Sequence, residues 1–129
     1  MNIEQNLLNL ARQAAKNAYA PYSKFCVGAA ILGKNGNYYY GCNVENISYP
    51  NGTCAETGAI AAMVSNGERH IEKILIYADS QTLITPCGAC LQRIAEFADN
   101  STQILLADKS GIKKNVSLTD LFPCSFKEF

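Results

Sequence analysis

The sequence contains no tryptophan, only one histidine and no excess of charge of either sign. Lysine plus arginine number 11, and aspartate plus glutamate also number 11, so the formal net charge is zero. Proteins that bind nucleic acid usually carry a basic excess gathered on one face. The composition therefore argues against a nucleic-acid partner. His70 is the only imidazole that could bind a metal.

Long apolar runs are also missing. No segment approaches the roughly 20 consecutive apolar residues that a membrane-spanning helix requires, and residues 1–5 lack the basic start of a signal peptide. We therefore expect a cytoplasmic protein with no membrane partner. The 129 residues are predicted to form one domain, residues 1–129, which is short for an enzyme that must enclose a small polar substrate.

Cysteine, in contrast, is plentiful, with six residues in this small chain. In a reducing compartment, closely spaced cysteines more often bind metal or carry out redox chemistry than form disulfides. Three of the six lie in two short motifs, Cys54-Ala55-Glu56 and Pro86-Cys87-Gly88-Ala89-Cys90. These two motifs are therefore the first candidates for a functional site.

The spacing of apolar residues predicts an α/β fold. Helices are predicted from Ile3 to Ala18 after the N-cap Asn2, from a cap at Thr53 to a stop at residues 66–67, and from Thr85-Pro86 through Phe97. Strands are predicted at residues 25–32, 37–44, 73–78, 102–107 and, more weakly, 112–117, and a short turn or helix at 118–122. This order favours a mixed sheet with helices on its faces.

The two cysteine motifs fall at the starts of two predicted helices. Cys87 and Cys90 are three residues apart and so share one helix face, while Cys54 lies at the start of the other helix. The free N–H groups and the macrodipole of a helix start favour thiolates. Three thiolates can hold zinc and leave one position open for water, at which the Glu56 carboxylate can move protons. The motifs therefore predict a hydrolytic zinc site.

Other interpretations of the same residues remain open at this stage. A structural zinc site would need a fourth protein ligand, for which Cys26, Cys42, Cys124 or His70 could serve. A redox Cys-x-x-Cys pair would explain neither Cys54 nor Glu56. Glu56 could also simply complement a helix N-terminus. The three cysteines outside the motifs are expected to be small buried hydrophobes.

Five segments in order resemble the small homotetrameric cytidine deaminases of the cytidine/deoxycytidylate deaminase family. Their shared pattern is a ligand-x-Glu motif followed by Pro-Cys-x-x-Cys, and the segments are residues 25–30, 41–50, 54–56, 86–90 and 121–126. The resemblance implies a three-layer α-β-α fold with a mixed central sheet of about five strands. It also implies a homotetramer with active sites shared between subunits, and one Zn²⁺ per subunit.

The resemblance further implies the reaction, which is hydrolytic deamination of cytidine and deoxycytidine to uridine and deoxyuridine with release of ammonia, in pyrimidine salvage. Zinc-bound hydroxide would attack C4 of the base, and Glu56 would move protons from the water to N3 and to the leaving amine. The implied metal ligands are Cys54, Cys87 and Cys90, and the implied catalytic residue is Glu56.

Substrate contacts are also implied by the resemblance. Asn43 and Glu45 would bind the ribose, and because residues two apart on a strand share a face, their amide and carboxylate can grip one sugar together. Val44 lies between them in the same run. Phe25 would pack beside the pyrimidine, the backbone at Cys54 and Ala55 would meet the base, and Phe126 would reach into the site of a neighbouring subunit.

The chain departs from the family pattern at two positions near the metal. Thr57 stands where the family usually carries an arginine that hydrogen-bonds the ligand thiolates, and Leu91 stands where it usually carries a second arginine. Both replacements remove positive charge near the metal. We expect the Thr57 hydroxyl to donate a hydrogen bond to a ligand sulfur and, with the helix N-terminal amides, to compensate the lost charge only in part.

Three other functions use the same metal motif or the same fold. The first is deamination of a modified cytosine nucleoside such as blasticidin S, although residues 43–46 favour an ordinary nucleoside. The second is nucleoside binding by a relative with weak or lost turnover, against which the presence of Glu56 argues. Deamination of a polynucleotide would need a route for flanking nucleotides, and the balanced charge does not favour one.

Overall fold

A computed structural model describes residues 2–128 of the chain. The helices are α1 (Ile3–Lys16), α2 (Ala55–Ser65), α3 (Gly88–Glu96) and α4 (Leu118–Leu121), with a single 3-10 turn, η1 (Tyr49–Asn51), before α2. The strands are β1 (Val27–Gly33), β2 (Tyr38–Cys42), β3 (Ile71–Ala78), β4 (Gln103–Asp108) and β5 (Gly111–Ser117). Apart from η1, each of these elements overlaps a helix, turn or strand that the sequence predicts.

The strands form one five-stranded sheet in the order β2-β1-β3-β4-β5. Strands β3 and β4 run parallel, and every other neighbouring pair is antiparallel. The parallel pair is joined by α3, as a parallel connection requires a crossover. The predicted mixed sheet is therefore confirmed.

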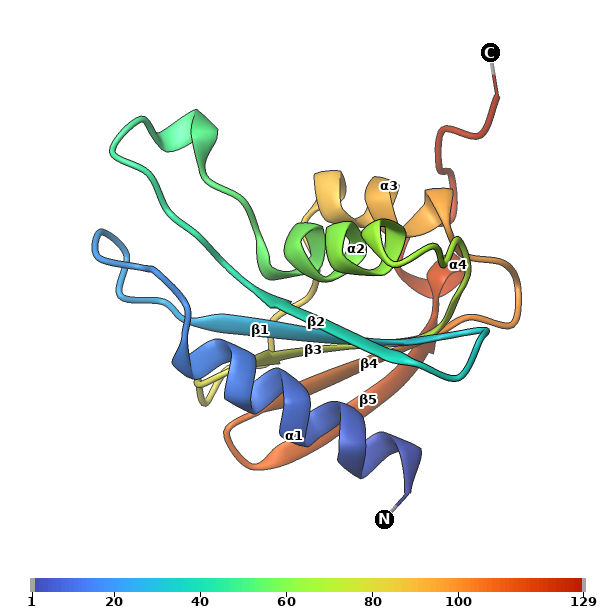
Figure 1. Ribbon diagram of the computed structural model, residues 1–129, viewed down its shortest axis with the longest axis horizontal. Helices are drawn as coiled ribbons and strands as arrows, with labels where there is room; N and C mark the ends of the chain where they lie inside the picture. Colours follow the sequence, from blue (N-terminus) through green and yellow to red (C-terminus); the bar gives the residue numbers. More distant parts are fainter. Residues whose placement is uncertain (1, 129) are drawn as a thin grey trace.

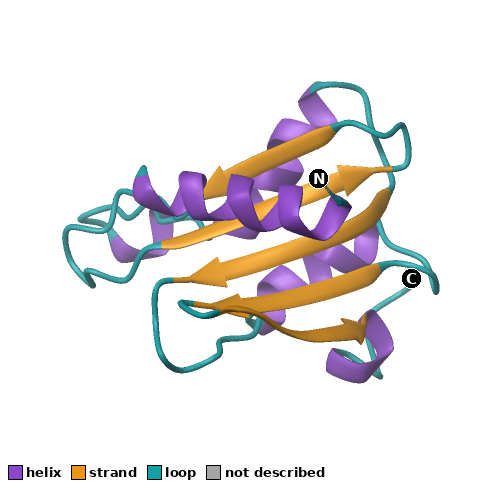
Figure 2. Ribbon diagram, turned by 90° about the horizontal axis from the view of Figure 1, so that it is seen from below, coloured by secondary structure: helices purple, strands orange, loops and turns teal. Residues whose placement is uncertain are grey.

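The two faces of the sheet are covered by different helices (Figure 1). Alternation along β1 directs Ile31 to the face that packs against α2 and α3, and Leu32 to the face that packs against α1. Figure 2, seen from the α1 side, shows α1 lying across the sheet while the other helices lie behind it. The predicted three layers, with helices on both faces, are confirmed.

Two glycines allow helices to lie directly on the sheet. A Cβ atom at Gly41 in β2 would come within 2.4 Å of the backbone nitrogen of Ala59 in α2, and one at Gly28 in β1 within 1.9 Å of the carbonyl oxygen of Ala11 in α1. Neither contact is possible for a larger residue without a backbone shift. Gly41 therefore sets how closely α2, and with it the first cysteine motif, approaches the sheet.

The predicted starts of both motif helices are one or more residues too early. Thr53 pairs through its N–H and carbonyl with Val44, and Cys54 after it is also extended, at φ −83° and ψ 164°, so α2 begins one residue later than predicted and Cys54 is its N-cap. Cys87, likewise extended at φ −72° and ψ 170°, is the N-cap of α3, which places Pro86 before the helix. Within residues 2–128, no helix is long and apolar enough to span a membrane.

Candidate metal centre

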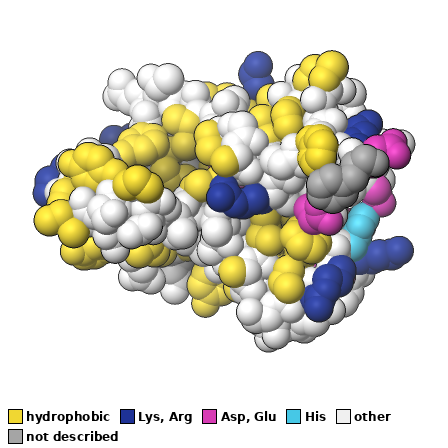
Figure 3. Space-filling model, turned by 90° about the horizontal axis from the view of Figure 1, so that it is seen from above, with side chains coloured by type: hydrophobic (Ala, Val, Ile, Leu, Met, Phe, Trp, Pro, Cys, Tyr) yellow, Lys and Arg dark blue, Asp and Glu magenta, His cyan; other side chains and the backbone are white. Residues whose placement is uncertain are grey.

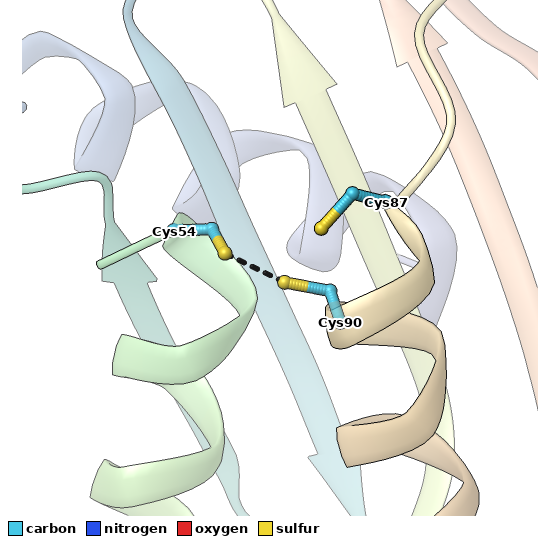
Figure 4. A group of neighbouring side chains, drawn as sticks. All are labelled: Cys54, Cys87 and Cys90. Carbon is cyan, nitrogen blue, oxygen red and sulfur yellow. Dashed lines mark hydrogen bonds between the residues drawn. The ribbon is translucent and has the colours of Figure 1, made fainter. Parts of the chain in front are cut away.

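The cysteine site is built from the N-termini of two helices. Cys54 and Cys87 are the N-cap residues of α2 and α3, and the sulfur of neither makes a capping hydrogen bond. The extended backbone of an N-cap turns the side chain past the helix end. Cys90 in the first turn of α3 then faces Cys54 from the other helix (Figure 4).

The three sulfur atoms lie within 4.8 Å of one another. Cys54 Sγ and Cys90 Sγ are 2.7 Å apart, which is longer than a disulfide bond. Sulfurs bound at about 2.3 Å to one tetrahedral zinc ion lie about 3.8 Å apart, so Cys54 and Cys90 must separate by about 1 Å to take up that geometry. Three cysteine sulfurs suit zinc, and the site leaves a fourth position open.

The other cysteines and the histidine do not complete this cluster. Among residues 2–128, Cys54, Cys87 and Cys90 are the only grouping of potential ligands close enough to hold one ion. His70 instead faces Asp99, with Nε2 3.4 Å from its carboxylate. A closed four-ligand structural site therefore lacks its fourth ligand. The expectation that the remaining cysteines are buried is wrong, because Cys26 and Cys42 are half-buried and Cys124 is exposed.

Glu56 lies at the start of α2, two residues after Cys54, and its side chain is buried with 4% exposure. Burial disfavours the charged form and raises the pKa of Glu56 to about 7, and the neighbouring Cys54 acts in the same direction. A carboxyl group with a pKa near neutrality can both accept and release protons at that pH. The environment of Glu56 therefore fits general acid-base chemistry.

The two close sulfurs shift each other's pKa in opposite directions. The hydrogen bond from Cys90 lowers the pKa of Cys54 to about 5, assisted by Thr57 and by the charge of Arg93. The same hydrogen bond, together with burial, raises the pKa of Cys90. Metal binding must therefore displace a proton from Cys90, as metal binding to thiols does in general.

Two side chains contact the ligand sulfurs from the helices themselves. Thr57 Oγ1 lies 3.8 Å from Cys54 Sγ, within reach of a hydrogen bond to sulfur, as the sequence predicts. Arg93 Nη1 donates to Cys90 Sγ across 3.7 Å. Arg93 is not predicted from the sequence, because it does not stand at a position that carries arginine in the family. The spacing from Cys90 to Arg93, which places both on one helix face, could have identified it.

A pocket of about 210 Å³ opens beside the three cysteines and Glu56. Asn43 and Ala55, both predicted to meet substrate, line it together with Val27, Ile84 and Thr85. The Asn43 side chain accepts from the Val27 N–H and donates to the Phe25 carbonyl, each at 2.8 Å. One amide hydrogen and one lone pair of Asn43 remain for a ligand. The pocket thus combines a candidate metal site, a buried carboxyl group and an oriented amide.

Glu45 does not share this pocket. It lines a second hollow of about 330 Å³ with Tyr22, Ser23 and Tyr49. Its carboxylate accepts from the backbone N–H groups of Tyr22 and Ser23 and from the Ser23 hydroxyl. The hydrogen bond from that hydroxyl lowers the pKa of Glu45. The structure therefore places Asn43 and Glu45 in two different pockets, whereas the sequence predicts that both residues bind the same sugar from one site.

The remaining predicted contact residues do not line the cysteine pocket. Phe25 is 39% exposed, and Val44 is exposed and pairs through its backbone with Thr53. Phe126, which is 62% exposed, follows α4 near the end of the described chain. The Gln92 side chain holds its backbone through two hydrogen bonds, of 2.9 and 3.3 Å. Phe126 does not line the cysteine pocket of its own chain.

Comparisons with known proteins agree on one family. The family model described as "Cytidine and deoxycytidylate deaminase zinc-binding region" matches residues 1–106. A cytidine deaminase from Sporosarcina psychrophila is 39% identical over 128 residues, which cover 99% of this chain and 93% of that protein. One from Mycobacterium tuberculosis is 36% identical over 126 residues, covering 97% and 91%.

Solved structures give the same result. A 1.6 Å crystal structure of cytidine deaminase from Burkholderia pseudomallei has a TM-score of 0.90 and 36% identity, and the match covers 98% of this chain and 100% of that one. The cytidine deaminase structure from M. tuberculosis has a TM-score of 0.83 and 34% identity, covering 98% and 100%. Fold and sequence thus point to the same relatives.

Proposed function

Because this chain belongs to the cytidine and deoxycytidylate deaminase family, we propose that it hydrolyses cytidine to uridine and ammonia, and deoxycytidine to deoxyuridine. The observation that carries this proposal is the buried carboxyl group of Glu56 beside three converging cysteines in one pocket. A pocket of about 210 Å³ suits part of a small polar molecule and lies open to solvent on one side, where Cys87 is exposed.

We assign Cys54, Cys87 and Cys90 as the ligands of one zinc ion per chain, supported by their convergence and by the zinc-binding family model. Zinc bound there supplies an activated water for attack on C4 of the base. The helix N-termini that carry the ligands direct N–H groups toward the thiolates and offset part of their charge. The protein therefore contributes both the ligands and part of their charge compensation.

Glu56 is assigned to proton transfer. Its carboxylate would take one proton from the attacking water and pass it to N3, so that C4 becomes electrophilic. It would then take the second proton from the hydroxyl now bonded to C4 and pass it to the exocyclic amine, which leaves as ammonia while C4 becomes the carbonyl of uridine. One water is consumed and one ammonia is released for each uridine formed. A pKa of about 7 suits a group that must accept and donate in the same cycle near neutral pH.

For substrate recognition we propose Asn43, Val44 and Glu45 at the ribose, Phe25 beside the pyrimidine and the backbone at Ala55 near the base. Asn43 supports this assignment because it lines the cysteine pocket with a free donor and a free acceptor. Three hydrogen bonds hold the Glu45 carboxylate in place and leave capacity for a sugar hydroxyl. A ribose that spans the two pockets would use both residues.

We further propose a homotetramer of single-domain subunits, residues 1–129, with Phe126 completing the site of a neighbour. Figure 3 shows hydrophobic side chains gathered at the left end of the molecule. The large exposed hydrophobic residues in the segments before β1 and before α2 include Tyr19, Tyr22, Ile47 and Tyr49. Patches of this kind commonly mark protein interfaces. A cytoplasmic location and the absence of membrane and nucleic-acid partners remain predictions of the sequence.

The test is to incubate the zinc-loaded protein with cytidine and to follow the loss of cytidine absorbance and the release of ammonia. We expect uridine and ammonia in equal amounts, and turnover of deoxycytidine as well. Blasticidin S serves as the matched alternative substrate. Turnover of blasticidin S without turnover of cytidine, or cytidine binding without any product, would contradict the proposal.

A further inference from the structure

The charge at the cysteine site is strongly negative. Three thiolates around one divalent cation leave a net charge of about −1, and the Glu56 carboxylate adds to it when ionised. The two positions at which the family places compensating arginines hold Thr57 and Leu91. Leu91 is 8% exposed and packs in the interior, where an unpaired guanidinium would be costly. The chain therefore needs a cation from another position.

Arg93 supplies a cation to this site. It lies three residues after Cys90 on α3, on the same helix face, and its Nη1 is 3.7 Å from Cys90 Sγ. Long side chains on a helix point back toward the N-terminus, so the guanidinium reaches from the last turn of α3 toward the ligands in its first turn. Its head remains in contact with solvent, since Arg93 is exposed.

We propose that Arg93 is the positioning residue that replaces both family arginines, and that it stabilises zinc binding by neutralising the Cys90 thiolate. The inference rests on the ligand assignment made under Proposed function. The alternative to this role of Arg93 is a purely structural one, in which its charge only complements the C-terminal dipole of α3. The contact to Cys90 Sγ distinguishes the two roles, because a residue that served only the helix end would point toward the last carbonyls.

The experiment measures the zinc dissociation constant by competition with a chromophoric chelator. We expect Arg93→Gln to bind zinc about ten-fold more weakly, at the low end of the 10- to 100-fold range for groups that contact metal ligands, because Arg93 is exposed. Arg93→Lys, which keeps the charge, should lose clearly less. Lys16→Gln, which removes a cation from the last turn of α1, is the matched control and should leave the constant unchanged.

A second measurement is the dependence of zinc affinity on ionic strength. The difference between the parent and Arg93→Gln should shrink as ionic strength rises, because screening weakens an exposed charge. Zinc affinity of Arg93→Gln within two-fold of the parent, an equal loss in Arg93→Lys, or a loss that does not respond to salt would each overturn the proposal. Failure of the parent itself to bind one zinc would instead overturn the ligand assignment, so the two failures are distinguishable.

Discussion

The N-cap geometry of Cys54 and Cys87 explains why a short motif can form a metal site. Each N-cap is extended, so its sulfur projects beyond the helix where the N–H groups are free. Glu56 follows Cys54 in the first turn, which brings a carboxyl group to the same end of α2. At the scale of single residues, the proposed chemistry therefore depends on four side chains at two helix starts.

The ligand assignment predicts different outcomes for the two groups of cysteines. Alanine at Cys54, Cys87 or Cys90 should remove bound zinc and turnover together, because two thiolates hold zinc weakly. Serine at Cys26, Cys42 or Cys124 should leave zinc content at one per chain, because these residues lie outside the cluster. Metal analysis of the six purified variants checks this. Full zinc content in all three cluster variants would contradict the assignment.

The assignment of Glu45 to the sugar predicts a substrate-dependent loss. Glu45→Ala should lower kcat/KM for cytidine by about 10- to 100-fold, as expected from the loss of one or two hydrogen bonds to a charged group, and should change turnover of the free base cytosine far less. Asn46→Ala, a neighbour in the same pocket, is the matched control. Equal losses on both substrates would show that Glu45 serves only to hold Tyr22 and Ser23.

The cluster of three cysteines was predictable because each motif is local in sequence, and the same motif places Glu56 beside it. Glu45 illustrates what was not predictable, since its orientation depends on Ser23, which lies 22 residues earlier and approaches only through the folded loop. Arg93 was missed for another reason. Its position is not one that carries arginine in the family, although its spacing of three residues from Cys90 places both side chains on one helix face and so could have indicated the contact.

At the scale of elements, the packing of α2 against β2 fixes where the first motif lies. Gly41 in β2 and Gly58 in α2 face each other, yet they differ in the space around them. A Cβ at Gly41 would lie 2.4 Å from Ala59 N, whereas one at Gly58 would lie 3.5 Å from its nearest neighbours, an ordinary contact. Only one of these glycines is therefore required by packing.

This difference predicts opposite effects of the same substitution. Gly41→Ala should lower the free energy of unfolding by about 1–3 kcal/mol through overpacking, and should impair zinc binding because α2 is displaced. Gly58→Ala should raise the free energy of unfolding by about 0.5–1 kcal/mol, since alanine is the better helix former. Chemical denaturation of the zinc-loaded proteins measures both values. Two changes of the same sign would contradict this packing.

The order and type of the predicted elements were correct because the apolar periodicity follows the two faces of the sheet. Their first residues were less accurate. Thr53 is an N-cap candidate by residue type, but it pairs with Val44, and the extended Cys54 takes the N-cap position instead. Cys87 takes that position in α3, so Pro86 lies before the helix. The error at α2 arises from the pairing of Thr53 with Val44, a contact between two loops that no local pattern encodes.

At the scale of the whole molecule, Phe126 in the C-terminal segment does not line the cysteine pocket of its own chain. Gln92, two residues after Cys90 on α3, pairs with both the N–H and the carbonyl of Phe126. This pairing fixes the segment while leaving the Phe126 side chain 62% exposed. The arrangement suits a residue that acts on a neighbouring subunit, and it connects the tail directly to the helix that carries two ligands.

A shared site predicts recovery of activity in mixed oligomers. A chain lacking residues 126–129 should be inactive or weakly active, and so should Glu56→Gln. Mixing the two should restore part of the turnover, because some sites then combine an intact Glu56 with an intact Phe126. Gln92→Leu should lower activity in the same direction as the truncation. No recovery, once subunit exchange has been demonstrated, would contradict a shared site.

The most direct test of the whole account is the cytidine turnover of Glu56→Gln at full zinc content. Glutamine preserves the shape of Glu56 but cannot carry protons, so we expect one zinc per chain, an unchanged fold and a loss of kcat of about 10⁴-fold or more. A variant that keeps its zinc and turns over cytidine within about ten-fold of the parent, roughly 1.4 kcal/mol of transition-state stabilisation, would contradict the account.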